Sequence, residues 1–183
     1  MKRIAVVCFA NTCRSPVAEA LLVRYLGPSS GFFVHSKGLA GGPGTTPSAM
    51  SEVLAERKVE LVSPSGERLA DTNWDDDLYL FMERSLLREA VVTRPALWPR
   101  SFTLREFARR AQLNPPQVHS ETFDEWLGVL HGTRSREDLL GVRSDDDVLD
   151  PGLGGSHEEF QQMVDTLDGI TRKVAQILSE WSR

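Results

Sequence analysis

The sequence contains few cysteines, no long hydrophobic run and no excess of positive charge. Its 183 residues include only Cys8 and Cys13, which are too few for the disulfide framework of a small secreted domain. No apolar stretch approaches the roughly 20 residues that a membrane-spanning helix needs, and the N-terminal apolar run is too short for a signal peptide. The formal net charge of −5 argues against nucleic-acid binding. We therefore expect a cytoplasmic protein with neither membrane nor nucleic-acid partners.

The rest of the composition is that of an ordinary soluble globular protein. Hydrophobic residues make up 40% of the chain and charged residues 26%, and the length is sufficient for one core. We predict a single domain, as a monomer or a weak homodimer. We expect no metal and no other cofactor, because the histidines show no cluster with ligand spacing: His35, His119, His131 and His157.

Short apolar runs that alternate with helical patterns predict an α/β fold. Four such runs are interpreted as strands, over residues 4–7, 32–36, 78–82 and 102–104. The alternation of strands and helices favours a layered fold with a parallel sheet. We therefore predict three layers, with a central four-stranded parallel sheet flanked by helices and an anion-binding loop between the first strand and the first helix.

Helix signals accompany these runs. Ser15 before Pro16 is typical of an N-cap followed by the first helical residue, and Gly27 predicts the end of that helix. The last helical pattern keeps one apolar face as far as Trp181, so this helix should pack along the sheet. Two capping boxes predict further helix starts, one formed by Thr103 with Glu106 and the other by Ser156 with Glu159.

Residues 109–147 fit this alternation less well. Ser120 is a candidate N-cap for a short helix, and the acidic run 145–147 has the composition of a solvated loop. We interpret about 109–147 as an insertion. The short helix would have one apolar face, formed by Phe123, Trp126, Leu127 and Leu130.

The segment from Cys8 to Ser15 joins the first predicted strand to the first helix. A turn in this position directs several backbone N–H groups toward one point, and the helix dipole adds positive potential there. A cysteine at the start of such a turn is stabilised as the thiolate, which makes it a nucleophile. The guanidinium of Arg14 can bind two oxygens of a tetrahedral oxyanion. The loop is therefore predicted to bind phosphate next to a reactive sulfur.

The residues CFANTCRSPVAEALL, at positions 8–22, resemble the active-site loop and first helix of the low-molecular-weight protein tyrosine phosphatases. VHSKG is similar to the second strand of that family, LYLFMERSLLREA to its third strand and following helix, and DPGLGGSHEEF to its Asp-Pro segment before the last helix. The resemblance covers most of the chain except 109–147. It implies a cofactor-free hydrolase that cleaves phosphomonoesters through a cysteinyl-phosphate, with phosphotyrosine in proteins as the favoured substrate.

The resemblance also implies a role for each matching residue. Cys8 would be the nucleophile, Arg14 would hold the phosphate, and Asp150 would be the general acid and later the base. Asn11 and Ser15 would shape the loop and stabilise the thiolate. The remaining substrate-binding candidates come from the loop and from the segment after Asp-Pro: Phe9, Ala10, Thr12, Cys13 and Leu153.

Several positions depart from the family pattern or allow two interpretations. Gly152 and Leu153 stand where aromatic residues line the phosphotyrosine slot, whereas Thr12 matches the family's phosphoarginine phosphatases. Ala10 replaces the usual loop glycine, which suggests either a negative φ or local strain. Cys13 is either a resolving thiol that protects Cys8 or a packing residue.

Other functions are compatible with the same residues. Among enzymes, the alternatives are a protein-arginine phosphatase, a phosphatase for a small metabolite, and an arsenate reductase that uses an external thiol. A catalytically inactive phosphate-binding module is the alternative from another class, although binding alone does not require the acid Asp150. Ser36 is either a brace for the loop or an ordinary serine at a strand end.

Overall fold

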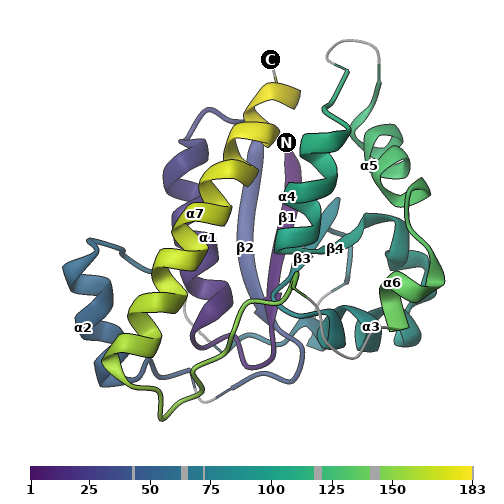
Figure 1. The fold of residues 1–183 in the computed structure, drawn as a ribbon. Helices are drawn as coiled ribbons and strands as arrows, with labels where there is room; N and C mark the ends of the chain where they lie inside the picture. The colour runs from purple at the N-terminus through teal and green to yellow at the C-terminus, as the bar shows by residue number, and fades with distance from the viewer. Residues whose placement is uncertain (43, 63–65, 72, 118–120, 141–144, 183) are drawn as a thin grey trace.

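A four-stranded parallel sheet lies at the centre of the molecule (Figure 1). The computed structural model describes residues 1–42, 44–62, 66–71, 73–117, 121–140 and 145–182. The strand order is β2-β1-β3-β4, and every neighbouring pair is parallel. The predicted fold class is therefore confirmed. The strands are β1 Lys2–Cys8, β2 Phe32–Gly38, β3 Leu78–Phe81 and β4 Ser101–Thr103.

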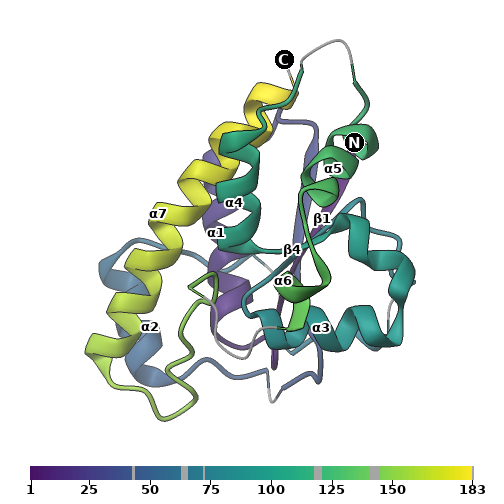
Figure 2. The ribbon, with the colours of Figure 1, turned by 45° about the vertical axis from the view of Figure 1, so that its right-hand side comes forward.

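Helices cover both faces of this sheet (Figures 1 and 2). The core on one face includes residues of α1, α4 and α7, whereas the smaller core on the other face includes residues of α3. Two 3₁₀ helices, Leu69–Asp71 and Pro95–Arg100, complete the described elements. The α-helices are α1 Arg14–Leu26, α2 Ser48–Glu56, α3 Arg84–Thr93, α4 Leu104–Leu113, α5 Phe123–Gly132, α6 Arg136–Leu140 and α7 His157–Trp181.

Strand β1 is buried on both faces. Ile4 and Val6 belong to the larger core, and Ala5 and Val7 belong to the smaller one. All four side chains are fully buried. A strand covered by helices on both faces requires a continuous apolar run rather than alternation, which is the pattern that predicted it.

Helix α1 begins two residues earlier than its sequence signal indicates. Cys13 is the N-cap and Arg14 is the first helical residue, so the prediction that Ser15 caps this helix is wrong. The hydroxyl of Ser15 is not available for capping because it contacts Cys8 and Asn11. The helix ends at Gly27, whose φ of 73° is a left-handed conformation that glycine adopts without strain, as predicted.

The long helix α7 closes one side of the molecule. It begins with the predicted capping box of Ser156 and Glu159 and packs against α1, α2 and α4. Both chain ends lie at the top of Figure 1, and the loop after β1 lies at the opposite end of the sheet. Within the described ranges, no helix is both long and apolar enough to cross a membrane.

The segment interpreted as an insertion is more ordered than its sequence indicates. Helix α5 buries the four predicted apolar residues, but its capping box is formed by Thr122 and Glu125. The other candidate cap, Ser120, lies outside the described residues. Helix α5 packs against the second 3₁₀ helix, and α6 packs against α3. Of the acidic residues that follow, Asp145 is exposed as predicted, but Asp146 is not solvated because it pairs with Arg84 and Arg109. The boundaries of the insertion stay a prediction.

Candidate active site

The loop after β1 occupies the position where parallel sheets bind ligands. Strand β1 has β2 on one side and β3 on the other, so the chain leaves the carboxyl ends of β1 and β3 in different directions. Ligands of open α/β sheets bind in the crevice at such a point. Cys8 is the last residue of β1, and Glu83 follows closely after the end of β3. The candidate site therefore starts from the ends of these two strands.

The sulfur of Cys8 accepts hydrogen bonds from its own loop. The backbone N–H of Asn11 donates to Sγ at 3.2 Å, and the Ser15 hydroxyl lies 3.0 Å from the same atom. Ser15 Oγ also lies 2.9 Å from Asn11 Oδ1, so its single proton serves one acceptor at a time. Donors that point at a sulfur stabilise its negative charge. The predicted thiolate-stabilising roles of Asn11 and Ser15 match this geometry.

The left-handed turn of the loop falls on asparagine rather than on Ala10. Asn11 has a φ of 52°, which asparagine tolerates better than most residues, and Ala10 is not among the residues with positive φ. The Asn11 side chain donates from Nδ2 to the carbonyl of Ser36 at 3.4 Å. Ser36 therefore contacts the loop through its backbone, whereas its buried hydroxyl has no partner in the described structure. The alanine in place of glycine requires no strained backbone.

The loop carbonyls are turned away from the cavity. The N–H groups of Leu39 and Ala40 donate to the carbonyls of Cys8 and Phe9, each at 2.9 Å. The N–H of Gly66 donates to the carbonyl of Asn11 at 2.9 Å. With these three carbonyls satisfied from outside, the loop can present N–H groups to an anion, which is the arrangement of a phosphate-binding turn.

Two glycines of the following segment allow the backbone to pass close to the loop. A Cβ atom at Gly38 would lie 2.8 Å from Ala10 C and Asn11 N. A Cβ atom at Gly42 would lie 2.6 Å from the Ala10 carbonyl oxygen and 2.7 Å from Thr12 Oγ1. All of these distances are too short for any side chain larger than hydrogen. The shape of the loop therefore depends on glycine at these two positions.

Arg14 is buried and binds three acceptors. Its exposed fraction is 1%, although it carries a full charge. Nη1 donates to Glu83 and, at 3.0 Å, to the carbonyl of Val148, and Nη2 donates to Asp150 Oδ2 at 2.5 Å. Charge-assisted bonds of this kind hold the guanidinium plane in one orientation. The fork is therefore fixed at the edge of the cavity by groups from two segments, one after β3 and one before α7.

Asp150 lies across the cavity entrance from the loop. Its side chain is 41% exposed, in contrast to the buried Arg14 that it contacts. The other carboxylate oxygen accepts the N–H of Gly152 at 2.9 Å, and Gly152 has a φ of 68°. The turn after Asp150 therefore requires a residue that tolerates positive φ, which explains glycine where the family pattern has an aromatic residue.

A cavity of about 340 Å³ opens between these groups. Asn11 and Ser15, which were predicted to bind substrate, are buried beneath the loop and contact Cys8 instead of lining this cavity. The glycines at its wall were not predicted: Gly41, Gly42 and Gly152. All other predicted site residues line it, namely Cys8, Phe9, Ala10, Thr12, Cys13, Arg14, Asp150 and Leu153.

The second cysteine has a different environment. Burial, together with the nearby charges of Asp150 and Cys8, raises the pKa of the Cys13 thiol to about 12, although Arg14 opposes this shift. Both cysteines are free thiols. Cys13 is therefore protonated at neutral pH, which makes it a weak nucleophile. This environment favours the packing interpretation of Cys13 over the resolving thiol.

Sequence reasoning missed two groups that hold Arg14. Glu83 directly precedes α3, and Val148 contributes only its backbone carbonyl. A carboxylate just after the third predicted strand was a usable signal, because the carboxyl ends of parallel strands meet at one edge. The contact from Val148 uses a backbone carbonyl, which every residue has, so the sequence carries no signal for it. The described residues include no group of three or more His, Cys, Asp or Glu side chains placed to hold a metal ion.

Comparison with known proteins identifies the family. A family model described as "Low molecular weight phosphotyrosine protein phosphatase" matches residues 3–130. The chain belongs to this family. Because the family consists of cysteine-based hydrolases, the enzyme class expected from the loop sequence is confirmed.

The relatives of this phosphatase include proteins named as tyrosine phosphatases and a protein named as an arginine phosphatase. A probable low-molecular-weight protein-tyrosine-phosphatase, EpsP of Ralstonia nicotianae, is 30% identical over 131 residues, which are 71% of this chain and 89% of the relative. A protein-arginine-phosphatase of Geobacillus stearothermophilus is 34% identical over 107 residues, which are 57% of this chain and 70% of the relative. The solution structure of a low-molecular-weight protein tyrosine phosphatase from Bacillus subtilis matches with a TM-score of 0.68 and 26% identity, over 99% of both chains.

Proposed function

We propose that this phosphatase hydrolyses phosphotyrosine in proteins in two steps, with Cys8 as nucleophile, Arg14 as phosphate ligand and Asp150 as proton donor. The observation that carries the proposal is the convergence of these three side chains on one cavity. Cys8 contributes a sulfur that accepts the Asn11 N–H and lies within reach of the Ser15 hydroxyl, and Asp150 lies at the entrance with a partly exposed carboxyl group. A module that only binds phosphate has no use for such an acid.

In the first step, Cys8 Sγ attacks phosphorus and forms the S–P bond while the bond between phosphorus and the phenolic oxygen breaks. Asp150 delivers its proton to the departing oxygen, a contribution of about 10²–10⁴ in rate for a typical general acid. In the second step, the Asp150 carboxylate removes a proton from water, and the water oxygen attacks phosphorus. The S–P bond then breaks, which releases inorganic phosphate and restores the Cys8 thiolate.

The substrate phosphate must compete for Arg14. Without substrate, Nη2 of Arg14 is bound to Asp150, whereas Nη1 is bound to Glu83 and the Val148 carbonyl. A phosphate on the loop would displace Asp150 from Nη2 and leave Nη1 in place. This exchange frees the Asp150 carboxyl to carry the proton, and it places the guanidinium next to the charge that spreads over the equatorial oxygens.

The apolar side chains in the cavity wall are suited to contact a flat apolar leaving group. Phe9 and Leu153 line the cavity and keep 53% and 58% of their surface exposed. These side chains would be covered by the phenyl ring of a phosphotyrosine, and burial of apolar surface contributes about 25 cal/mol per Å². The aromatic wall after the Asp-Pro pair is missing, so Phe9 is the one ring that lines this cavity among the described residues.

Protein-arginine phosphatase activity is the second candidate. Thr12 lines the cavity, and its hydroxyl donates to the carbonyl of Ala10 at 3.3 Å. The oxygen of that hydroxyl can accept a hydrogen bond from a substrate guanidinium, which a phenyl ring does not offer. Relatives named as arginine phosphatases agree with this candidate. The ratio of kcat/KM for phosphoarginine and phosphotyrosine peptides decides between them, and Thr12→Val should lower the phosphoarginine rate selectively.

Two substitutions test the mechanism directly. Cys8→Ser should abolish turnover of p-nitrophenyl phosphate while phosphate binding persists, because the loop N–H groups and Arg14 remain. Asp150→Asn should lower kcat on an alkyl phosphate by about 10²–10⁴ and should affect a good leaving group much less. Wild-type protein that binds phosphate without turnover would favour the binding module instead. An arsenate-dependent consumption of external thiol would favour the reductase, and faster hydrolysis of sugar phosphates than of either amino acid would favour a metabolite phosphatase.

The thiol chemistry also supports a location and a partner class. Cys8 must stay reduced to act as a nucleophile, and reducing compartments keep thiols free. A cytoplasmic location meets this requirement. The partner is a phosphorylated protein, whose phosphorylated side chain enters the cavity from the surface formed by Phe9 and Leu153.

A further inference from the structure

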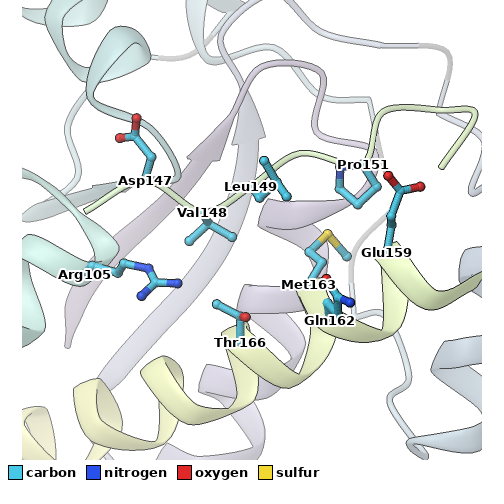
Figure 3. Close-up of a pocket in the computed structure, with 9 residues that line it drawn as sticks. All are labelled: Arg105, Asp147, Val148, Leu149, Pro151, Glu159, Gln162, Met163 and Thr166. Atoms are coloured by element: carbon cyan, nitrogen blue, oxygen red, sulfur yellow. The ribbon is translucent and has the colours of Figure 1, made fainter. Parts of the chain in front are cut away.

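A second, smaller pocket lies behind the segment that carries Asp150 (Figure 3). It has a volume of about 140 Å³, and its walls come from α4, from α7 and from the segment 147–151 between them. We call it the back pocket. Its lining residues are Arg105, Asp147, Val148, Leu149, Pro151, Glu159, Gln162, Met163 and Thr166.

Arg105 is the positively charged residue among those that line the back pocket. Its guanidinium points into the pocket toward Val148 and Thr166 (Figure 3). Its Nε atom is buried and has no hydrogen-bond acceptor within the described structure. A buried donor without an acceptor costs about 1–3 kcal/mol, and more when it is charged. The neighbouring Arg109, by contrast, is paired with Asp146. The back pocket therefore contains a cation that is poised to bind an anion.

The two carboxylates in the wall already have donors of their own. Asp147 Oδ1 accepts the N–H of Arg84 at 2.8 Å, at the start of α3. Glu159 belongs to the capping box of α7, where hydrogen bonds from Ser156 lower its pKa and keep it ionised. Glu159 lies at the far end of the pocket from Arg105 (Figure 3). Because Arg105 is the single cation among the described residues that line the pocket, a ligand with one negative charge suits the pocket better than a phosphate dianion.

The remainder of the wall is largely apolar. Val148 and Met163 are buried, Leu149 and Pro151 lie beside them, and Thr166 faces them from α7. An engineered apolar cavity of about 150 Å³ holds one benzene molecule, which is close to the volume found here. The body of the ligand should therefore be apolar and no larger than one six-membered ring.

We propose that the back pocket binds a small apolar monocarboxylate of about the size of benzoate. Its carboxylate accepts hydrogen bonds from Arg105, and its apolar body packs between Val148 and Met163. This site is separate from the phosphate loop and is reached from the opposite side of the segment that carries Asp150.

A ligand in the back pocket would affect the active site because the segment 147–151 contributes residues to both cavities. The N–H of Val148 donates to Met82 at 2.8 Å, and its carbonyl accepts from Arg14 at 3.0 Å. Asp150 and Pro151 follow directly in the chain, and Pro151 contributes to the back pocket. A carboxylate metabolite in this pocket would therefore contact the peptide that holds the phosphate-binding arginine.

Benzoate is the probe, and nitrogen-15 NMR is the measurement. Inorganic phosphate is present at saturation so that the phosphate loop is filled before benzoate is added. Benzoate should shift the Arg105 Nε–H signal and the amide signals of Val148 and Leu149, with a Kd of about 1 mM or lower. Benzamide, which has the same shape without the charge, should bind roughly tenfold more weakly because the charge-assisted bond is lost.

Arg105→Gln should weaken benzoate binding by about tenfold or more, the loss expected for a hydrogen bond to a charged group. Lys173→Gln, an exposed change on α7 near the same helix pair, is the matched control and should leave binding unchanged. Equal affinity for benzoate and benzamide would overturn the proposal, as would shifts confined to the phosphate loop. The benzamide comparison needs no substitution, so it decides the question even if Arg105→Gln folds poorly. Neither measurement depends on turnover.

Discussion

Two centres of the molecule bury arginine, and they differ in what surrounds the charge. Arg14, at the phosphate loop, has its fork bound by Glu83 and Asp150, whose side chains are 30% and 41% exposed. Arg134, in the segment interpreted as an insertion, has a side chain that is 2% exposed, and Glu106 beside it is equally buried. Arg14 lines a cavity, so we call its surroundings the open centre. Arg134 is shielded from solvent, so we call its surroundings the closed centre.

The closed centre is stabilised by more than its ion pair. Glu106 Oε1 accepts from Arg110 Nε at 2.8 Å and lies 3.1 Å from Arg134 Nε, although Arg134 Nε has no well-aligned hydrogen bond. The Arg134 guanidinium packs over the rings of Phe102, at 4.5 Å, and Trp98, at 5.7 Å. Burial lowers the pKa of Arg134 to about 10 despite Glu106. This centre joins α4 to the segment after α5.

The difference shows how a buried charge can serve ligand binding. A buried arginine with fully buried partners cannot exchange them without exposing unpaired charge, so it contributes to structure. Arg14 has partners that reach solvent, and one of them can be replaced by a substrate phosphate. The comparison predicts that damage at Arg14 appears in catalysis and that damage at Glu106 appears in stability.

The largest expected effect is on catalysis at the open centre. Arg14→Lys keeps the charge but loses the planar fork, so kcat/KM on p-nitrophenyl phosphate should fall by about 10³. The melting temperature should change little, since the ammonium can still pair with Glu83 and Asp150. Steady-state kinetics and calorimetry on the same preparation check both parts. A variant with near-normal kcat/KM would show that Arg14 does not hold the phosphate.

The next effect is on stability at the closed centre. Glu106→Gln preserves the shape of the capping box but leaves Arg110 and Arg134 without a buried counter-charge, which should cost about 3 kcal/mol. For a chain of this size the melting temperature should fall by roughly 6–12 °C. Glu89→Gln, an exposed change on α3, is the control for loss of one negative charge. A large loss of kcat with an unchanged melting temperature would contradict the assignment of Glu106 to stability and of Arg14 to catalysis.

The smallest effect compares the two cysteines of the loop. The pKa of the Cys13 thiol rises from its ordinary 9.0 to about 12 in the folded protein. Between these values the unfolded chain loses the proton first, so the wild-type protein should lose stability as the pH rises through this window. Cys13→Ser should lack this part of the alkaline loss and should retain most of the activity. Denaturation curves at several alkaline pH values measure this loss of stability. An equal pH dependence of the free energy of unfolding in both proteins would contradict the assigned pKa.

Local signals in the sequence predicted the strands and much of the phosphate loop. A continuous run of apolar residues marks β1, because burial on both faces excludes polar residues. The spacing from Cys8 to Arg14 places a sulfur and a guanidinium on one turn, since the loop between them is short. The capping boxes of α4 and α7 were also predicted, because both partners lie within one helical turn.

The errors occurred where a side chain had more than one possible partner. Ser15 has the signal of an N-cap, but the sulfur of Cys8 and the Asn11 side chain are within its reach in the folded loop. Asp146 belongs to an acidic run whose composition is typical of a solvated loop. In the structure it forms salt bridges with Arg84 and Arg109, which come from two different helices. Neighbours in the chain did not reveal these competing partners.

The resemblance to the family implied Asp150 as the acid, and the sequence alone determined the fold class and predicted an anion-binding loop with Cys8 and Arg14. It did so because hydrophobic period, capping and loop spacing are local properties of the chain. Only the tertiary structure decided that Glu83 and the Val148 carbonyl hold Arg14, that Gly42 lies against Thr12, and that Arg105 lines a pocket with an Nε atom that has no acceptor among the described residues. Those contacts join segments far apart in the sequence, and packing of the whole chain is what brings them together.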